Sequence, residues 1–226
     1  MKNEEYNAYN DLFPSVEQSF AFETPCLVCR QNGYAFTGKD CIWGNGNVDA
    51  NIMIIGKDSA GADTKEPVWK GSRVTLMPLT NKKTGAKMRI LLHKADIDPF
   101  SVVITNTVKC NIGYDDFNVS YTQLVKSCSR YLTQEIRRIH PKMIITLGAD
   151  AQKSLNSLCT ARHALAIINI ASNELLANAP PFLGTFASGV TAEIWNFKHP
   201  SYVEGETREC HYVNNLKTIQ QRLDTL

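Results

Sequence analysis

The 226-residue sequence lacks a long hydrophobic run, an internal repeat and a strong excess of charge of one sign. No stretch approaches the roughly 20 apolar residues that a membrane-spanning helix needs. The first twenty residues carry five charged side chains and no apolar core of a secretion signal. With 43% hydrophobic and 20% charged residues, the composition is that of a globular protein. We therefore expect one cytoplasmic domain over residues 1–226, with an N-terminal extension over 1–24 and no membrane contact.

Acidic residues are scarce in one window of the chain. Residues 65–94 hold eight Lys and Arg residues but a single acid, Glu66, although the whole chain has a formal net charge of only +2. A local basic patch is enough to bind phosphates. A solvated basic face is the ordinary alternative.

Short apolar runs rich in β-branched residues predict buried strands. Three are clear and a fourth is weaker: 51–56, 101–106, 142–148 and 192–197. Because these runs are continuous rather than alternating, they are typical of strands buried on both faces of a parallel sheet.

Helical patterns lie between these strands. Met88, Leu91, Leu92 and Ala95 keep helical spacing, and a longer helix is expected from Ser120 to Pro141, with Ser120 and Gln123 as a capping box. Further helices are expected from 149 and over 212–226. Alternating strands and helices predict an α/β fold, a three-layer α/β/α sandwich around a mainly parallel four-stranded sheet. The nearly uncharged stretch within 161–191 is interpreted as an insertion or lid.

Polar residues and glycine stand where the predicted strands end. Gly56 and Asn106 close two strands, and His199 follows the fourth. Ligands of parallel sheets bind at the carboxyl ends of the strands, so these residues are expected to converge on one site.

Four of the seven cysteines form a candidate metal-ligand set. Cys26 and Cys29 are separated by two residues, and Cys110 and Cys128 follow at a distance. One close pair plus two distant thiolates suits a tetrahedral metal or an iron–sulfur cluster. Buried free thiols are the alternative. Cys41, Cys159 and Cys210 are expected to be ordinary thiols.

Taken in order, these segments resemble the iron–sulfur branch, family 4, of the uracil-DNA glycosylase superfamily. The likeness spans about 25–202 and rests on the cysteine spacing and on four segments: 55–63, 104–110, 141–149 and 199–201. The resemblance implies a monomeric DNA-binding enzyme that flips a base out of DNA and hydrolyses its N-glycosidic bond.

The resemblance also implies roles for individual residues. Cys26, Cys29, Cys110 and Cys128 would bind a [4Fe-4S] cluster, with zinc as the alternative. Asn106 would read the flipped base, and His199 would stabilise the departing base. Further substrate contacts are expected from Gly56, Lys57, Ser59, Trp69 and Ser201. DNA contacts are expected from Lys70, Arg73, Asn81, Lys82, Lys83 and Tyr202. Trp69 is nearly as compatible with a place in the core.

The first motif departs from the family pattern. Lys57 follows Gly56 at the place where the family usually has an acid. Asp58 is the first candidate to orient water, and Asp63 is the second. Lys57 itself is a candidate amine nucleophile or a phosphate contact. The departure leaves two other functions open: excision of a modified base, such as a hypermodified cytosine of phage DNA, in antiviral defence, or DNA binding without catalysis.

Overall fold

The computed structural model of the chain describes residues 44–58, 84–109, 119–165 and 180–226. Within these ranges there is one sheet of seven strands. In spatial order the strands are β1 (Asn45–Gly46), β3 (Val103–Asn106), β2 (Ile52–Gly56), β4 (Met143–Leu147), β7 (Thr191–Phe197), β6 (Phe182–Phe186) and β5 (Cys159–Ala164).

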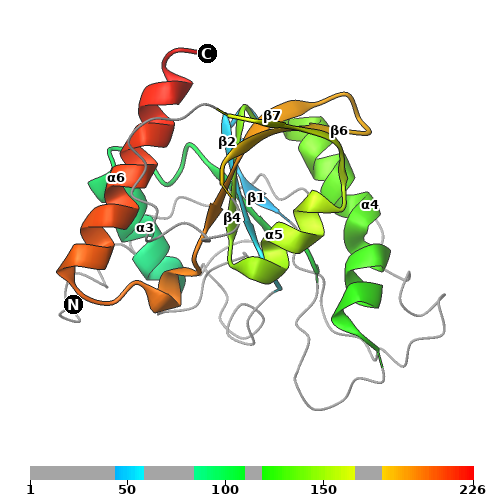
Figure 1. Cartoon of the computed structure of the whole chain (residues 1–226), viewed down its shortest axis with the longest axis horizontal. Coiled ribbons are helices and arrows are strands. Elements are labelled where there is room, and N and C mark those ends of the chain that lie inside the picture. The colour runs from blue at the N-terminus through cyan, green and yellow to red at the C-terminus, as the bar shows by residue number, and fades with distance from the viewer. Residues whose placement is uncertain (1–43, 59–83, 110–118, 166–179) are drawn as a thin grey trace, which may run out of the picture.

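Helices cover both faces of this sheet (Figure 1). On one face lie α3 (Thr84–Lys94) and α6 (Glu206–Leu223), and on the other lie α4 (Tyr121–Ile139) and α5 (Ala149–Asn156). The predicted three-layer α/β/α architecture is confirmed. Among the described residues, no helix combines the length and the apolar character needed to cross a membrane.

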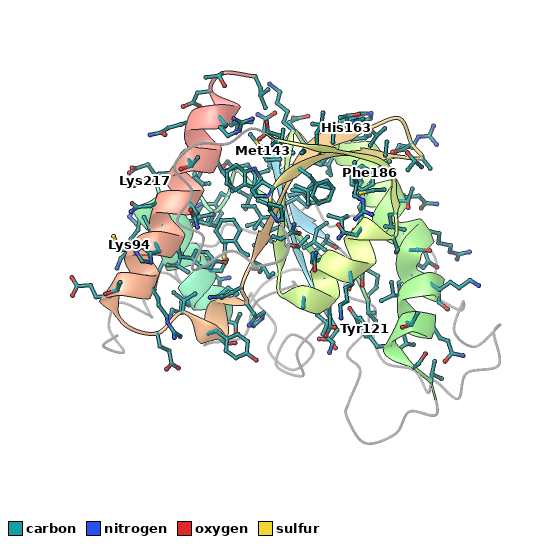
Figure 2. All side chains as sticks on the ribbon, in the orientation of Figure 1. Lys94, Tyr121, Met143, His163, Phe186 and Lys217 are labelled. Carbon is teal, nitrogen blue, oxygen red and sulfur yellow. The ribbon has the colours of Figure 1, made fainter. Side chains whose placement is uncertain are left out.

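The four predicted strands form the parallel centre of the sheet. Neighbours in the row β3, β2, β4, β7 all run parallel. Gly56 pairs with Asn106 at one side of this row, and Leu147 pairs with Phe197 at the other. The four carboxyl ends therefore lie along one edge of the sheet. Figure 2 shows Met143, the first residue of β4, at the opposite end of the molecule from Tyr121, which begins α4.

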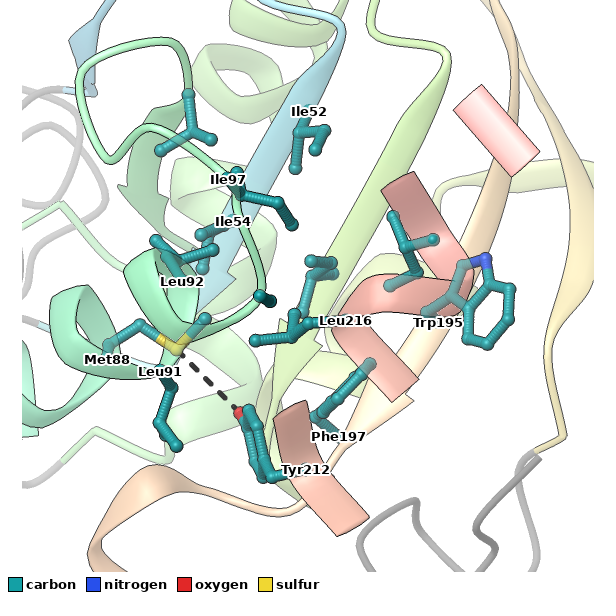
Figure 3. Close-up of a cluster of buried hydrophobic side chains, with 14 of the residues drawn as sticks. Ile52, Ile54, Met88, Leu91, Leu92, Ile97, Trp195, Phe197, Tyr212 and Leu216 are labelled. Carbon is teal, nitrogen blue, oxygen red and sulfur yellow. Dashed lines mark hydrogen bonds between the residues drawn. The ribbon is translucent and has the colours of Figure 1, made fainter. Parts of the chain in front are cut away.

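Strands β2 and β4 are buried along their whole length, which explains their continuous apolar runs. Ile52 and Ile54 pack with α3 and α6, whereas Met53 and Ile55 pack with α4 on the other face. Figure 3 shows the first of these clusters, where the Tyr212 hydroxyl lies 3.8 Å from the Met88 sulfur.

Three antiparallel strands extend the sheet beyond the predicted four. β1 joins β3 at one side, and β6 and β5 continue from β7 at the other. β5 and β6 contain residues of the 161–191 stretch interpreted as an insertion or lid, but 166–179 lie outside the described residues. Gly184 obscures the strand signal of β6. Ile194 packs closely against this glycine, since a Cβ there would lie 2.4 Å from the Ile194 Cδ1 atom, and a larger residue would require the Ile194 side chain to shift.

The predicted helices are present, with one different boundary. Ser120 and Gln123 form the expected capping box, and α4 ends at Ile139, before Pro141. Met88, Leu91, Leu92 and Ala95 are all buried against the sheet. The last helix begins six residues earlier than predicted, at Glu206 after Gly205.

Candidate active site

The ends of β2 and β3 are joined beyond their last residues. The Thr107 N–H donates to the Gly56 carbonyl at 2.9 Å, and the Val108 N–H donates to the Lys57 carbonyl at 3.0 Å. The Lys57 carbonyl also accepts from the Thr107 hydroxyl at 2.6 Å and lies 3.3 Å from the Tyr121 hydroxyl. These bonds fix the backbone that follows Gly56, although loops at strand ends are usually more mobile than the strands.

Gly56 makes room for the side chain of Asn106. A Cβ at position 56 would lie 2.4 Å from the Asn106 Oδ1 atom and 3.6 Å from its Cγ atom. Asn106 is almost fully buried at the end of β3. Its amide therefore lies against the backbone of the neighbouring strand, and any side chain at position 56 would displace it.

The Lys57 side chain forms an ion pair at the same edge of the sheet. Its Nζ lies 2.9 Å from Asp150 Oδ2 and 4.8 Å from the centre of the Tyr121 ring. The hydrogen bond to Asp150 raises the Lys57 pKa, and the nearby charge of Asp58 acts in the same direction. Lys57 is therefore a protonated ammonium near two carboxylates.

Sequence reasoning missed three residues of this cluster: Asp150, Thr107 and Tyr121. Asp150 lies in the first turn of α5, directly beyond the carboxyl end of β4, so the rule that placed Gly56 and Asn106 also applies to it. Thr107 follows Asn106, and its hydroxyl lies 2.6 Å from that of Tyr121. Nothing in the sequence pointed to Tyr121, because only the helix start at Ser120 was evident.

His199 lies at the far end of the parallel row, beyond β7. It precedes the short helix η3 (Pro200–Tyr202) in an extended conformation, as a residue before proline prefers. Its Nδ1 atom accepts from the Ser201 N–H at 3.3 Å and lies 2.7 Å from the Ser201 hydroxyl. Because a backbone N–H can only donate, Nδ1 carries no proton in this arrangement, and Nε2 is the protonated nitrogen. Burial lowers the His199 pKa, which favours this neutral form.

Gly148 places His199 against the end of β4. Gly148 has a φ of 90° and donates its N–H to the Phe197 carbonyl at 2.8 Å. A Cβ there would touch the Cβ of His199 at 3.6 Å. Asn106 ends β3 and His199 follows β7, and these strands are three positions apart in the row, which corresponds to roughly 14 Å between their axes. Between these two strands lie β2 and β4, and the Lys57–Asp150 ion pair connects the segments that follow them.

Comparison with known proteins assigns the chain to a family. The family model of the uracil DNA glycosylase superfamily matches residues 43–224. The chain belongs to this superfamily. A relative is the type-4 uracil-DNA glycosylase of Pyrobaculum aerophilum, which is 28% identical over 138 residues. That match covers 61% of this chain and 62% of the relative, so the chain spans less than two thirds of the relative's length.

Several predicted site residues fall outside the described part of this superfamily member. Ser59 and Trp69 do so, as do the expected DNA contacts Lys70, Arg73, Asn81, Lys82 and Lys83. Two described residues of the basic window do not form an open basic surface, since Arg89 is buried and Lys94 pairs with Glu209. Tyr202 is 68% exposed, beside His199.

Of the four predicted cluster ligands, only Cys128 lies among the described residues. It is buried on α4 in a cluster with Val108 and Leu124, and Val108 stands two residues before Cys110. No group of three or more metal-ligating side chains occurs within the described residues. Burial raises the Cys159 pKa to about 11, as expected for an ordinary thiol, and Cys210 is exposed on α6.

Gly56→Ala tests the packing of Asn106. The added methyl group would displace the Asn106 amide while leaving the rest of β2 able to pair. If Asn106 reads a flipped base, as the resemblance to the family implies, we expect base release to fall at least tenfold, with less loss of thermal stability than in the control below. Gly189→Ala is the control, because Gly189 has a φ of 82° and nothing within 4 Å of a Cβ. It should cost about 1–2 kcal/mol of stability through backbone strain and leave activity intact. Full activity of Gly56→Ala would contradict the expected role of the Asn106 amide in the position that it has beside Gly56.

Proposed function

We propose that the protein is a DNA glycosylase that hydrolyses the N-glycosidic bond of a flipped uracil or related base. The observation that supports this most directly is the row of strand ends from Asn106 to His199, with charged groups between them. Membership of the uracil DNA glycosylase superfamily gives the reaction class. The named activity of the type-4 relative favours uracil as the first base to test.

The reaction requires opposite charges to be stabilised at two places. The base must leave the stack before a protein can reach its glycosidic bond. As the bond breaks, positive charge develops on the sugar and negative charge on the departing base. A competent site therefore holds a hydrogen-bond donor at the base and carboxylates near the sugar.

His199 is proposed to donate a hydrogen bond to the departing base. Its Nε2 carries the proton because Nδ1 accepts from Ser201. A neutral imidazole can keep this donor in place as negative charge grows on a base oxygen. In this proposal Ser201, which was expected to contact substrate, instead selects the tautomer of His199.

Asn106 is proposed to read the flipped base. A side-chain amide offers one donor group and one acceptor group, so it can distinguish uracil from cytosine by their hydrogen-bonding patterns. Its close packing on Gly56 limits rotation of the amide. Limited rotation is what allows an amide to reject a base with the opposite pattern.

The carboxylates near Lys57 are proposed to serve the sugar side of the reaction. Asp58 is proposed to align water, as expected from the sequence, and Asp150 adds a second negative charge close by. Lys57 is held as an ammonium, which has no lone pair for nucleophilic attack. Hydrolysis by water is therefore favoured over the lyase-type reaction that a neutral lysine would support.

Exposed and basic residues are proposed to hold DNA. Tyr202 stands beside His199, and the Arg208 side chain bonds to the Tyr202 carbonyl at 3.2 Å. This arrangement supports the expectation that Tyr202 contacts DNA. Lys70, Arg73, Asn81, Lys82 and Lys83 remain proposed phosphate contacts on the basis of the sequence alone.

A [4Fe-4S] cluster is proposed to be bound by Cys26, Cys29, Cys110 and Cys128. Four thiolates are a suitable donor set, and the shared packing of Cys128 and Val108 is compatible with Cys110 lying near Cys128. The cluster would supply a structural brace between distant segments of the chain. No step of the proposed reaction passes through it.

Asn106→Ala and His199→Ala test the two end positions of the site. Each is expected to lower the single-turnover rate of uracil release about 100-fold, the order seen when a donor to a developing negative charge is removed. His163→Ala on β5 and Asn214→Ala on α6 are matched exposed controls. The substrates are oligonucleotides with uracil, hypermodified cytosine or normal bases. Unimpaired release by both site variants would remove these roles, and binding without release of any base would support the non-catalytic alternative.

The pH dependence of base release tests the protonation state of His199. Burial lowers its pKa, so the neutral form persists as pH falls to the ordinary histidine value of 6.5. We expect the rate to decline only below that pH. Ser201→Ala should shift the decline to higher pH, because the neutral imidazole loses a hydrogen-bond partner. A rate that declines above pH 6.5 in the wild type would contradict this state of His199.

Borohydride trapping tests the role of Lys57. An amine nucleophile forms an imine with the sugar aldehyde, and reduction of the imine links protein to DNA covalently. Since Asp150 raises the Lys57 pKa, we expect base release without a trapped complex. A complex that disappears in Lys57→Met would establish the lyase reaction instead.

A further inference from the structure

A buried ion pair lies behind the candidate active site and is not used by the proposed reaction. Lys109 Nζ and Glu135 Oε2 are 2.5 Å apart, and neither side chain is exposed to solvent. The pair joins the segment after β3 to α4. Removing two charges from water is costly, and apolar residues of similar volume are often at least as stable in such places. Stability alone therefore gives a weak reason for this pair.

Every N–H group of the Lys109 ammonium has a partner. Besides Glu135, the ammonium donates to the Thr105 hydroxyl at 2.6 Å and to the Asn106 carbonyl at 2.7 Å. The Glu135 carboxylate also accepts from the Thr105 hydroxyl at 2.8 Å and from the Gly44 N–H at 3.0 Å. An ammonium has three donors, so its orientation is fixed by these three acceptors.

The bond to the Asn106 carbonyl acts on the proposed base-reading residue. Thr107 N–H, in the peptide group that contains this carbonyl, donates to Gly56 on β2. The Asn106–Thr107 peptide is therefore held on one side by β2 and on the other by Lys109. The orientation of this peptide sets the direction in which the Asn106 side chain leaves the backbone.

We propose that Lys109 is a positioning residue for Asn106, held by the Thr105 hydroxyl and the Asn106 carbonyl, and that Glu135 only compensates the buried charge of Lys109. The inference rests on the proposed base-reading role of Asn106. Lys109 itself does not touch the substrate. Lys109 therefore affects the preference for uracil over cytosine and the rate of uracil release. It does not affect the affinity for DNA, because other residues contact the DNA.

The test removes both charges together, because Lys109→Met alone would leave Glu135 buried without its partner. The double variant Lys109→Met/Glu135→Gln keeps similar side-chain volumes. We expect the full-length protein with these changes to fold, to bind DNA within about threefold of wild type, and to release uracil at least tenfold more slowly in single turnover. The ratio of uracil release to cytosine release should also fall.

Two single variants separate positioning from stability. Glu135→Gln keeps the Lys109 bond to the Asn106 carbonyl, so it should unfold at a lower temperature yet release uracil within threefold of wild type. Arg222→Gln breaks the Arg222–Glu193 pair at the amino end of β7. This change is expected to lower the unfolding temperature without changing the rate or the base preference.

The results distinguish this inference from the proposed function. No base release by the wild-type protein would overturn the proposed function. An active wild type together with a folded double variant of normal rate and selectivity would overturn the positioning role of Lys109. If the double variant does not fold, Lys109→Gln decides, because its amide can still pair with Glu135 but lacks the ammonium that holds the Asn106 carbonyl. Uracil release at least tenfold slower than wild type in the folded variant supports the role, and a normal rate overturns it.

Discussion

Parallel pairing of β2 with β3 and β4 is the constraint on which the rest of the structure depends. β2 is central and buried on both faces, so its apolar side chains set the positions of both helical layers. The same pairing brings Gly56 beside Asn106, and β4 in turn pairs with β7, beyond whose end His199 lies. A shift of one residue in β2 would turn every side chain to the opposite face and separate Gly56 from Asn106.

Charge in the candidate site is arranged around groups that keep a defined protonation state. His199 is neutral because it is buried and its Nδ1 accepts from Ser201. Lys57 is charged because Asp150 accepts its hydrogen bond. Each state is produced by direct contacts within the fold, so the site is organised without a bound ligand.

The sequence was sufficient to predict the centre of the fold but not its edges. Buried parallel strands need continuous apolar residues, so β2, β3, β4 and β7 were all evident. β6 was missed because Gly184, which packs closely against Ile194, interrupts its pattern. β1 has two residues, too few for any pattern.

The candidate site was predictable where residues follow strand ends directly. Gly56, Asn106 and His199 were located by that rule and lie along one edge of the sheet. The same rule also covers Thr107 and Asp150, which directly follow β3 and β4, but it was not applied to them. Tyr121 could not be predicted because its contacts with Thr107 and Lys57 join distant segments. The Lys109–Glu135 pair was also missed, since a lysine and a glutamate 26 positions apart give no sign of contact. Such pairings are set by tertiary packing rather than by local sequence.

The Lys57–Asp150 ion pair has a consequence for the evolution of the superfamily. Lys57 follows β2 and Asp150 follows β4, so a mutation can change one residue of the pair without the other. An acid at position 57 beside Asp150 and Asp58 would crowd three negative charges together, and like charges at short range oppose ionisation. Homologues with an acid at position 57 should therefore lack the acid at position 150, and the two sites should covary.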